Sequence, residues 1–242
     1  MKALAKIAAI IPAFNEEKSI ESVIAEIRAL KSTAGLDIDA IVVNDCSRDR
    51  TSEIASKTEC ILLNLPVNLG IGGAVQTGFK YALLKGYDYA VQIDGDGQHP
   101  PSEIVKLFKA MQEQKLDVVI GSRFIDKLGF QSTFVRRLGI NYFMFLNRLL
   151  TGQRITDSTS GLRLINRKTL EIAGNNYPDE YPEPESIVLY AFNNLKIGEV
   201  AVEMRERQGG ISSIGSVASL YYLFKVSLAM FFTYLRTRRN KG

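Results

Sequence analysis

The sequence has little cysteine, little net charge and no low-complexity tract. Its two cysteines, Cys46 and Cys60, have neither the spacing of a metal site nor that of a disulfide framework, which favours a reducing compartment. Lys2 and Lys6 lead directly into a short apolar strand, so no signal peptide is expected. The formal net charge is only +4 over 242 residues, and this does not indicate a nucleic-acid-binding protein.

What is present is an ordinary globular composition, with 46% hydrophobic and 23% charged residues. The length is sufficient for one large α/β domain with a full core. The pattern shows no internal repeat and no linker. We expect a catalytic domain over residues 1–213, followed by an apolar and basic helix and tail over residues 214–242.

The first half of the chain alternates short apolar runs with helical periodicity, which is typical of βαβ units and a mostly parallel sheet. Strands are expected at residues 7–11, 38–43, 60–65, 89–93 and 117–120, with helices at 16–31, 49–57, 68–84 and 101–114. Beyond residue 132 the pattern predicts a helix at 134–150, a strand at 161–165, a helix at 186–193 and a strand at 197–204.

The most informative stretch is V-Q-I-D-G-D-G-Q-H-P-P, over residues 91–101. An apolar strand ends on Asp94 and Asp96, and because side chains alternate along a strand, both leave it in the same direction. Mg²⁺ typically binds one or two carboxylates together with substrate phosphates. The run therefore predicts a metal–diphosphate site, with a simple Asp-Gly turn as the alternative.

Polar residues also follow other expected strands. The four groups occupy residues 12–16, 44–47, 68–70 and 94–98. In open parallel sheets, ligands bind in the crevice outside the carboxyl ends of the strands. Asp45 can accept a hydrogen bond from a base or ribose, and the helix that starts at Gly70 suits a phosphate. A turn is the alternative for Asp45, and contact with a helix dipole is the alternative for Glu16.

The run G-I-G-G-A over residues 70–74 is similar to part of a dinucleotide fingerprint. That fingerprint opens the first strand–helix turn and is followed about twenty residues later by an acidic residue. Here the run follows the third expected strand, and the acids downstream form the metal-type pair. This arrangement disfavours a nicotinamide-dependent dehydrogenase.

Six motifs occur in the order P-A-F-N-E-E, V-N-D-C-S-R-D, N-L-G-I-G-G-A, D-G-D-G-Q-H-P-P, G-S-R-F and D-S-T-S-G-L-R. Over roughly residues 5–213 the chain resembles family 2 glycosyltransferases, and within them the dolichyl- or polyprenyl-phosphate sugar synthase branch. The resemblance implies the GT-A fold and a single inverting displacement. It also implies a UDP- or GDP-linked sugar donor and a divalent cation, Mg or Mn.

The same resemblance implies roles for individual residues. The nucleotide side would be formed by Pro12, Ala13, Asn15, Glu16, Asp45, Gly70 and Asp94. The metal would be held by Asp94, Asp96 and Gln98, and catalysis would use Asp94, Asp96, Arg163 and Glu185. Acceptor or phosphate contacts would come from Arg123, Asp157, Ser160, Arg163, Arg207 and Ser212, with ordinary surface arginines as the alternative. His99, the single histidine, is interpreted as a turn residue packed beside two prolines.

A loop near the end of the resemblance, with Arg207, Gly210 and Ser212, is similar to an R-x-x-G-x-S-K loop that closes over the site. Ser213 stands where that pattern has a lysine, so this chain lacks the lysine ammonium group that would contact phosphate there.

The acceptor decides whether a catalytic base is needed. A lipid monophosphate has its second pKa near 6 and is nucleophilic at neutral pH, whereas a sugar hydroxyl must be deprotonated by a carboxylate. Glu185 is expected to face the site as a base, and Asp157 is a second candidate. Alternatively, Glu185 stabilises a helix N-terminus and Asp157 caps a turn. We expect a polyprenyl phosphate acceptor. The alternatives are a hydroxyl of a lipid-linked glycan in surface-polysaccharide synthesis and a catalytically silent subunit of a membrane complex.

An apolar segment over residues 214–235 carries one charge, Lys225, and precedes the basic tail. As a helix it is about 33 Å long, enough to span a bilayer. A spanning orientation would, however, bury Lys225 near the middle of the bilayer. It would also place the basic tail on the side away from the cytoplasm, whereas basic residues favour the cytoplasmic side. We expect a peripheral helix at the cytoplasmic face, beside the helix at 134–150. It would contact lipid or a small membrane protein, with a core or dimer helix and a true span as alternatives.

Overall fold

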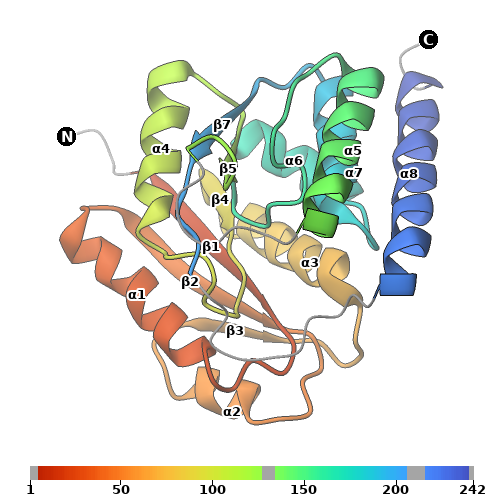
Figure 1. Cartoon of the computed structure of the whole chain (residues 1–242). Helices are drawn as coiled ribbons and strands as arrows, with labels where there is room; N and C mark the ends of the chain where they lie inside the picture. Colours follow the sequence, from red (N-terminus) through yellow and green to blue (C-terminus); the bar gives the residue numbers. More distant parts are fainter. Residues whose placement is uncertain (1–4, 127–133, 206–215, 240–242) are drawn as a thin grey trace.

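The computed structural model describes residues 5–126, 134–205 and 216–239. Seven strands of this part form one sheet in the order β3-β2-β1-β4-β6-β5-β7 (Figure 1). They are β1 (Lys6–Ala13), β2 (Asp37–Asn44), β3 (Ile61–Asn64), β4 (Tyr89–Gln92), β5 (Val118–Ser122), β6 (Arg163–Asn166) and β7 (Ile197–Ala201). Only β6 runs antiparallel to its neighbours, so the predicted mostly parallel sheet is confirmed.

The helices of the described residues are α1 (Ile20–Thr33), α2 (Thr51–Ser56), α3 (Gly70–Leu84), α4 (Glu103–Gln114), α5 (Phe134–Thr151), α6 (Arg167–Asn176), α7 (Pro182–Phe192) and α8 (Ser216–Arg239). Several begin later than the sequence pattern predicts, because the polar residues after a strand first form a turn. Glu16 and Glu17, for example, use their backbone amides to bind Thr51 Oγ1 and Asp49 Oδ2, and α1 starts only at Ile20.

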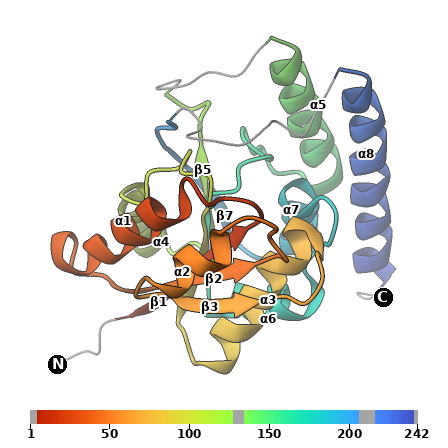
Figure 2. The same cartoon turned by 90° about the horizontal axis from the view of Figure 1, so that it is seen from below.

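Two apolar cores lie on opposite faces of the sheet, with helices covering both (Figures 1 and 2). The alternation of side chains along β1 divides it between them. Ile7, Ala9 and Ile11 pack with α1 and α4, whereas Ala8 and Ile10 pack with α3. In α3, Gly78 allows close approach, since a Cβ there would lie 2.3 Å from Ile10 Cγ2.

A third cluster joins α5, α7 and α8, which lie along one side of the molecule (Figure 2). Its buried members are Phe143, Val188, Val226 and Met230. The hydroxyls of Tyr142 on α5 and Ser227 on α8 are 2.8 Å apart. Among the described residues, no helix combines the length and hydrophobicity needed to cross a bilayer.

The antiparallel strand β6 decides which loops meet at the site. Because β6 runs against β4 and β5, the residues that precede it, 157–162, reach the edge where β4 and β5 end. This edge also receives the carboxyl ends of β1 and β2, which are parallel to β4. Five segments that are distant in sequence therefore converge on one rim of the sheet.

Candidate active site

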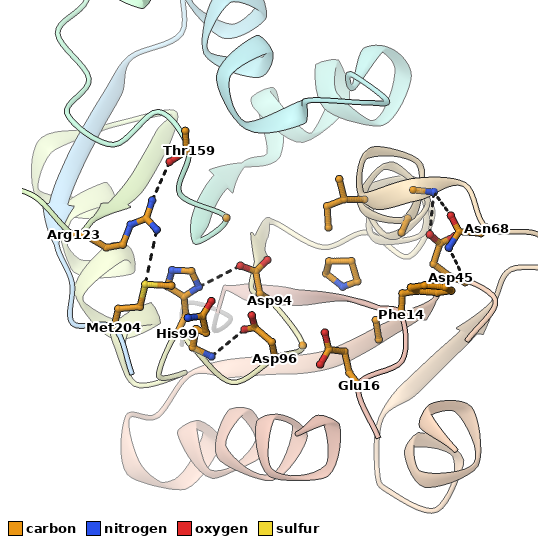
Figure 3. Close-up of a pocket in the computed structure, with 18 residues that line it drawn as sticks. Phe14, Glu16, Asp45, Asn68, Asp94, Asp96, His99, Arg123, Thr159 and Met204 are labelled. Carbon is orange, nitrogen blue, oxygen red and sulfur yellow. Dashed lines mark hydrogen bonds and ion pairs between the residues drawn. The ribbon is translucent and has the colours of Figure 1, made fainter. Parts of the chain in front are cut away.

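A cleft of about 540 Å³ opens at this rim (Figure 3), a volume typical of small-molecule sites. It is lined by Pro12, Ala13, Phe14, Glu16, Asp45, Asn68, Gly70, Ile71, Ala74, Asp94, Gly95, Asp96, Gln98, His99, Arg123, Thr159, Gly161 and Met204. The residues predicted from sequence that the structure brings together here are Pro12, Ala13, Glu16, Asp45, Gly70, Asp94, Asp96, Gln98 and Arg123.

Asp45 lies at one end of the cleft, where it caps α3. Its carboxylate oxygens accept hydrogen bonds from the amides of Leu69, at 2.6 Å, and Gly70, at 2.9 Å. The first amides of a helix have no partner within the helix and carry its positive dipole end, which explains why an acid is held there. Asp45 is thus buried between β2 and α3. Its carboxylate lies at the first turn of α3, and both Asp45 and Gly70 line the cleft.

Phe14 is a cleft residue that the sequence analysis did not single out. Its side chain is 44% exposed beside Asp45, so an aromatic face borders the cavity (Figure 3). Aromatic faces of this kind stack on planar bases. The signal available in the sequence was a phenylalanine among polar neighbours directly after a buried strand.

Asn15 was predicted to contact the nucleotide, but the structure places it outside the cleft lining. Its backbone has a φ of 58°, a left-handed conformation that asparagine tolerates. The side-chain Oδ1 of Asn15 accepts a hydrogen bond from Arg48 N at 2.8 Å, and the backbone N–H of Asn15 donates to Ser47 Oγ at 3.0 Å. Asn15 therefore ties the loop after β1 to the loop after β2.

The acid pair follows β4, and both carboxylates line the cleft. Asp96 is almost fully buried, and its Oδ1 accepts a hydrogen bond from Gln98 N at 3.0 Å. The Asp94 side chain is 33% exposed. A Cβ at Gly161 would lie 2.7 Å from each Asp94 oxygen, so the glycine leaves the space that this carboxylate occupies.

These residues fit a divalent cation bound jointly with a diphosphate. Among the described residues, no group of three or more His, Cys, Asp or Glu side chains is arranged to hold a metal ion by itself. Mg²⁺, however, usually binds one or two carboxylates and completes its shell with water and substrate phosphate. Asp94 and Asp96 supply hard oxygen donors in one cleft, Gln98 adds an amide oxygen, and the space left by Gly161 keeps Asp94 accessible.

Arg123 brings a buried positive charge to the opposite wall. Asp157, completely buried, binds its guanidinium with both oxygens, and Thr159 Oγ1 accepts a further hydrogen bond at 3.0 Å. Burial disfavours the charged form, but Asp157 and the nearby Asp94 prevail and raise the pKa of Arg123. Asp157 does not line the cleft, which corrects its predicted contact with the acceptor and its candidacy as a base: both of its oxygens are engaged by Arg123.

Arg163 and Ser160 do not line the cleft either, although both were predicted to contact phosphate. The Arg163 guanidinium is buried and donates to the carbonyl oxygens of Ser158, Ser160 and Glu183 and to Ser186 Oγ. The Oγ of Ser160 accepts a hydrogen bond from Leu162 N. Arg163 therefore anchors the loop that carries Gly161 to the start of α7, because three backbone carbonyls and the Ser186 hydroxyl accept its guanidinium hydrogen bonds.

Glu185 was expected to face the site, and the structure places it against α8. Its Oε2 accepts a hydrogen bond from Thr233 Oγ1 at 3.1 Å, and burial raises its pKa. Glu183 lies closer to the acid pair: it is near Gln92 Nε2, at 3.4 Å, and burial together with Asp94 raises its pKa against the effect of Arg163. Neither glutamate lines the cleft.

The remaining predicted residues, Arg207 and Ser212, lie with Gly210 and Ser213 outside the described residues. His99 is buried in a bend directly before Pro100, in agreement with its interpretation as a packed turn residue; it also lines the cleft, and its Nδ1 lies 3.5 Å from Asp94 Oδ2.

Comparison with known proteins agrees with this geometry. The family model described as Glycosyl transferase family 2 matches residues 8–172. UDP-N-acetylglucosamine–dolichyl-phosphate N-acetylglucosaminyltransferase of Methanococcus voltae is 31% identical over 214 residues, covering 80% of this chain and 83% of that protein. Polyprenol monophosphomannose synthase of Mycolicibacterium smegmatis is 28% identical over 228 residues, covering 90% and 84% respectively.

Among solved structures, glucosyl-3-phosphoglycerate synthase of Mycobacterium tuberculosis is similar in fold. Its complex with Mn²⁺, UDP-glucose and phosphoglyceric acid gives a TM-score of 0.71 at 22% identity. The match covers 98% of this chain and 80% of that one. This likeness confirms the fold predicted from the sequence.

Proposed function

Because the chain belongs to glycosyltransferase family 2, we propose that it transfers a sugar from a nucleotide sugar to a polyprenyl phosphate at a membrane surface. The transfer is a single displacement that inverts the anomeric centre. Relatives that match most of this chain are named for transfer to dolichyl phosphate or for making a polyprenol monophosphate sugar, which supports this acceptor class.

One observation carries the choice of acceptor: the acids predicted as bases are turned away from the cleft. Asp157 is bound by Arg123, and Glu185 is bound by Thr233. A phosphate monoester has its second pKa near 6 and attacks without a base, whereas a sugar hydroxyl requires one. Arg123, with its charge maintained by Asp157, would attract the anionic acceptor.

The nucleotide would occupy the other end of the cleft. Phe14 offers a face on which the base stacks, and Asp45 offers a carboxylate to the base or ribose. Gly70, at the head of α3, lines the same cavity, and its amide holds the Asp45 carboxylate at this end of the cleft. Uracil and guanine are both compatible with these contacts.

Asp94, Asp96 and Gln98 would hold Mg²⁺ or Mn²⁺ together with the diphosphate. A cation bound there offsets the negative charge that develops on the leaving nucleoside diphosphate. Gly161 leaves room for the Asp94 carboxylate, and the backbone N–H of Gln98 orients the Asp96 carboxylate. Arg163 contributes indirectly because it fixes the loop that contains Gly161.

A cytoplasmic membrane surface would be contacted through α5 and α8. Both helices expose large apolar side chains at helical spacing: Tyr142, Phe145 and Leu149 on α5, and Phe224, Leu228, Phe231 and Leu235 on α8. Exposed arginines, Arg148, Arg236 and Arg238, accompany them. Apolar side chains flanked by basic ones favour an anionic lipid interface, with a small membrane protein as the alternative partner. On this proposal residues 214–242 form a docking element appended to a catalytic domain at 1–213.

The test is an incubation of the purified full chain with radiolabelled UDP- and GDP-sugars and Mg²⁺ or Mn²⁺. One arm contains undecaprenyl phosphate, and the other contains a lipid-linked saccharide. An alkali-stable, mild-acid-labile lipid that carries one sugar supports the proposal. Extension of the saccharide alone would assign the hydroxyl acceptor instead, and full activity of Asp96→Ala in a reconstituted complex would indicate a catalytically silent subunit.

A further inference from the structure

The imidazole of His99 is a polar group buried in the turn that follows the acid pair. Its exposed fraction is 1%, and neither Nδ1 nor Nε2 makes a hydrogen bond to the described residues. A neutral imidazole always carries one N–H donor and one acceptor nitrogen. Buried side-chain polar atoms are satisfied in the large majority of cases, so an exception inside a cleft requires an explanation.

The ring is held in place by the turn that follows the acid pair. Pro100 and Pro101 come directly after His99, and their carbonyl oxygens accept hydrogen bonds from Glu103 N and Ile104 N, both at 3.0 Å. The prolines fix two backbone φ angles, and these hydrogen bonds join the turn to the start of α4. His99 therefore presents its ring from a rigid support.

The ring is directed at one of the two predicted metal-binding carboxylates. His99 Nδ1 lies 3.5 Å from Asp94 Oδ2, a contact drawn in Figure 3. This separation exceeds the usual N–H···O distance of about 2.9 Å, and hydrogen bonds in ligand-free sites are often long and tighten when ligands bind. On another side, the carboxylate packs against the backbone of Gly161, where a Cβ would lie 2.7 Å from each Asp94 oxygen.

We propose that His99 is a positioning residue for the cation and diphosphate. Its Nδ1–H donates to Asp94 Oδ2 in the loaded enzyme and thereby orients the carboxylate toward the cation. The inference rests on the function proposed above. Ligands of metal ions are commonly oriented by hydrogen bonds from neighbouring groups, and loss of such a group typically weakens metal affinity about 10–100-fold.

Two substitutions separate the ring nitrogens. The amide nitrogen of asparagine takes approximately the place of Nδ1, and that of glutamine approximately the place of Nε2. We expect Mn²⁺ affinity, measured with UDP or GDP from the EPR signal of free Mn²⁺, to stay within about twofold of wild type in His99→Asn. In His99→Gln and His99→Leu it should fall about 10–100-fold.

A second measurement needs no variant. His99 is the only histidine of the sequence, so ¹⁵N-histidine NMR of the tag-free chain reports this ring alone. With Mg²⁺ and nucleotide bound, the proton is expected on Nδ1. A proton on Nε2 would overturn the proposal, because Nδ1 would then be an acceptor facing a carboxylate or a direct metal ligand.

The outcomes distinguish this inference from the proposed function. Wild-type affinity in both His99→Gln and His99→Leu overturns the role of His99 and leaves the cation site intact. Retention in His99→Gln with loss in His99→Asn assigns the working nitrogen to Nε2 and also overturns the proposal. If the wild type binds no Mn²⁺ with either nucleotide, the proposed cation site falls, and the role of His99 falls with it.

Discussion

Asp157 binds the Arg123 guanidinium in a two-point contact, with Nε to Oδ2 at 2.6 Å and Nη2 to Oδ1 at 2.7 Å. The planar fork of arginine matches a carboxylate in this geometry, and a lysine would not. Glu199 on β7 supports the pair from below, since its carboxylate accepts hydrogen bonds from the amides of Thr156 and Asp157. The positive charge at the cleft is thus held by two successive layers of polar contacts, from Asp157 and from Glu199.

Replacing Asp157 with asparagine should therefore be costly. Asparagine has an acceptor oxygen in place of only one of the two carboxylate oxygens, so the two-point contact with Arg123 is lost and the guanidinium is left buried without its counter-charge. We expect a loss of about 3–5 kcal/mol in unfolding free energy, measured by urea denaturation, together with reduced kcat/KM. Asp126→Asn, at an exposed aspartate close in sequence, is the matched control and should change neither value appreciably. Wild-type stability of Asp157→Asn would show that the pair does not hold Arg123.

A methyl group at Gly161 should disturb the acid pair directly. The Cβ of Gly161→Ala would lie 2.7 Å from both Asp94 oxygens, closer than van der Waals contact allows, so the carboxylate must turn away. We expect Mn²⁺ affinity in the presence of nucleotide and kcat/KM to fall at least about tenfold, the scale of a misplaced metal ligand. Gly139→Ala on α5 is the control, because its Cβ meets only Leu223 Cδ2, at 3.7 Å. Equal Mn²⁺ binding by the two variants would contradict the geometric argument.

The rim of the sheet could be predicted from sequence because its signals are local. Each buried strand ends on polar residues, and parallel strands deliver such ends to one edge. Asp94, Asp96 and Asp45 were therefore expected at the cleft, and all three line it. Partnerships between distant segments leave no such local signal. Asp157 and Arg123 are 34 positions apart, and nothing in either segment indicates that the carboxylate of one will bind the guanidinium of the other.

Glu185 does not face the site as expected, and the reason is geometric. The helix was expected to begin near Glu185, but α7 begins at Pro182 and contains both residues. Residues that are two positions apart on a helix differ by about 200° around its axis, so the side chains of Glu183 and Glu185 point to nearly opposite sides. Glu185 thus meets Thr233 on α8, while Glu183 points toward Gln92. The helix α6 was also missed, since its capping residue Asn166 ends the preceding strand.

The buried Glu183 predicts a pH-dependent stability. Burial raises its pKa, so the folded state binds this proton more tightly than the unfolded state. The associated stability is fully present below the ordinary glutamate pKa and is lost as pH rises through the raised value. Glu183→Gln removes this titration. The difference in Tm between Glu183→Gln and wild type should therefore increase in favour of the variant as the pH rises from below the ordinary glutamate pKa to above neutrality. Exposed Glu203→Gln provides the control, and a difference for Glu183→Gln that does not change with pH would refute the prediction.

The proposed membrane surface can be tested on exposed side chains without disturbing the core. Deleting α8 is a poor test, because Val226 and Met230 are buried against α5 and α7. Phe224 and Phe231 are 68% and 46% exposed on α8, so their replacement by serine should lower Tm much less than removal of the buried Val226 and Met230 would.

Burying a phenylalanine side chain is worth about 1.5–3 kcal/mol, and partial insertion realises some of this for each residue. The double variant Phe224→Ser and Phe231→Ser should therefore lose at least about tenfold in cosedimentation with vesicles of phosphatidylglycerol and phosphatidylcholine. Leu84→Ser is the matched control, since Leu84 is 80% exposed at the end of α3. Wild-type binding should also weaken as salt increases, because Arg148 and Arg236 contribute by charge. If the double variant and Leu84→Ser bind vesicles equally well, the exposed face of α8 does not contact the lipid.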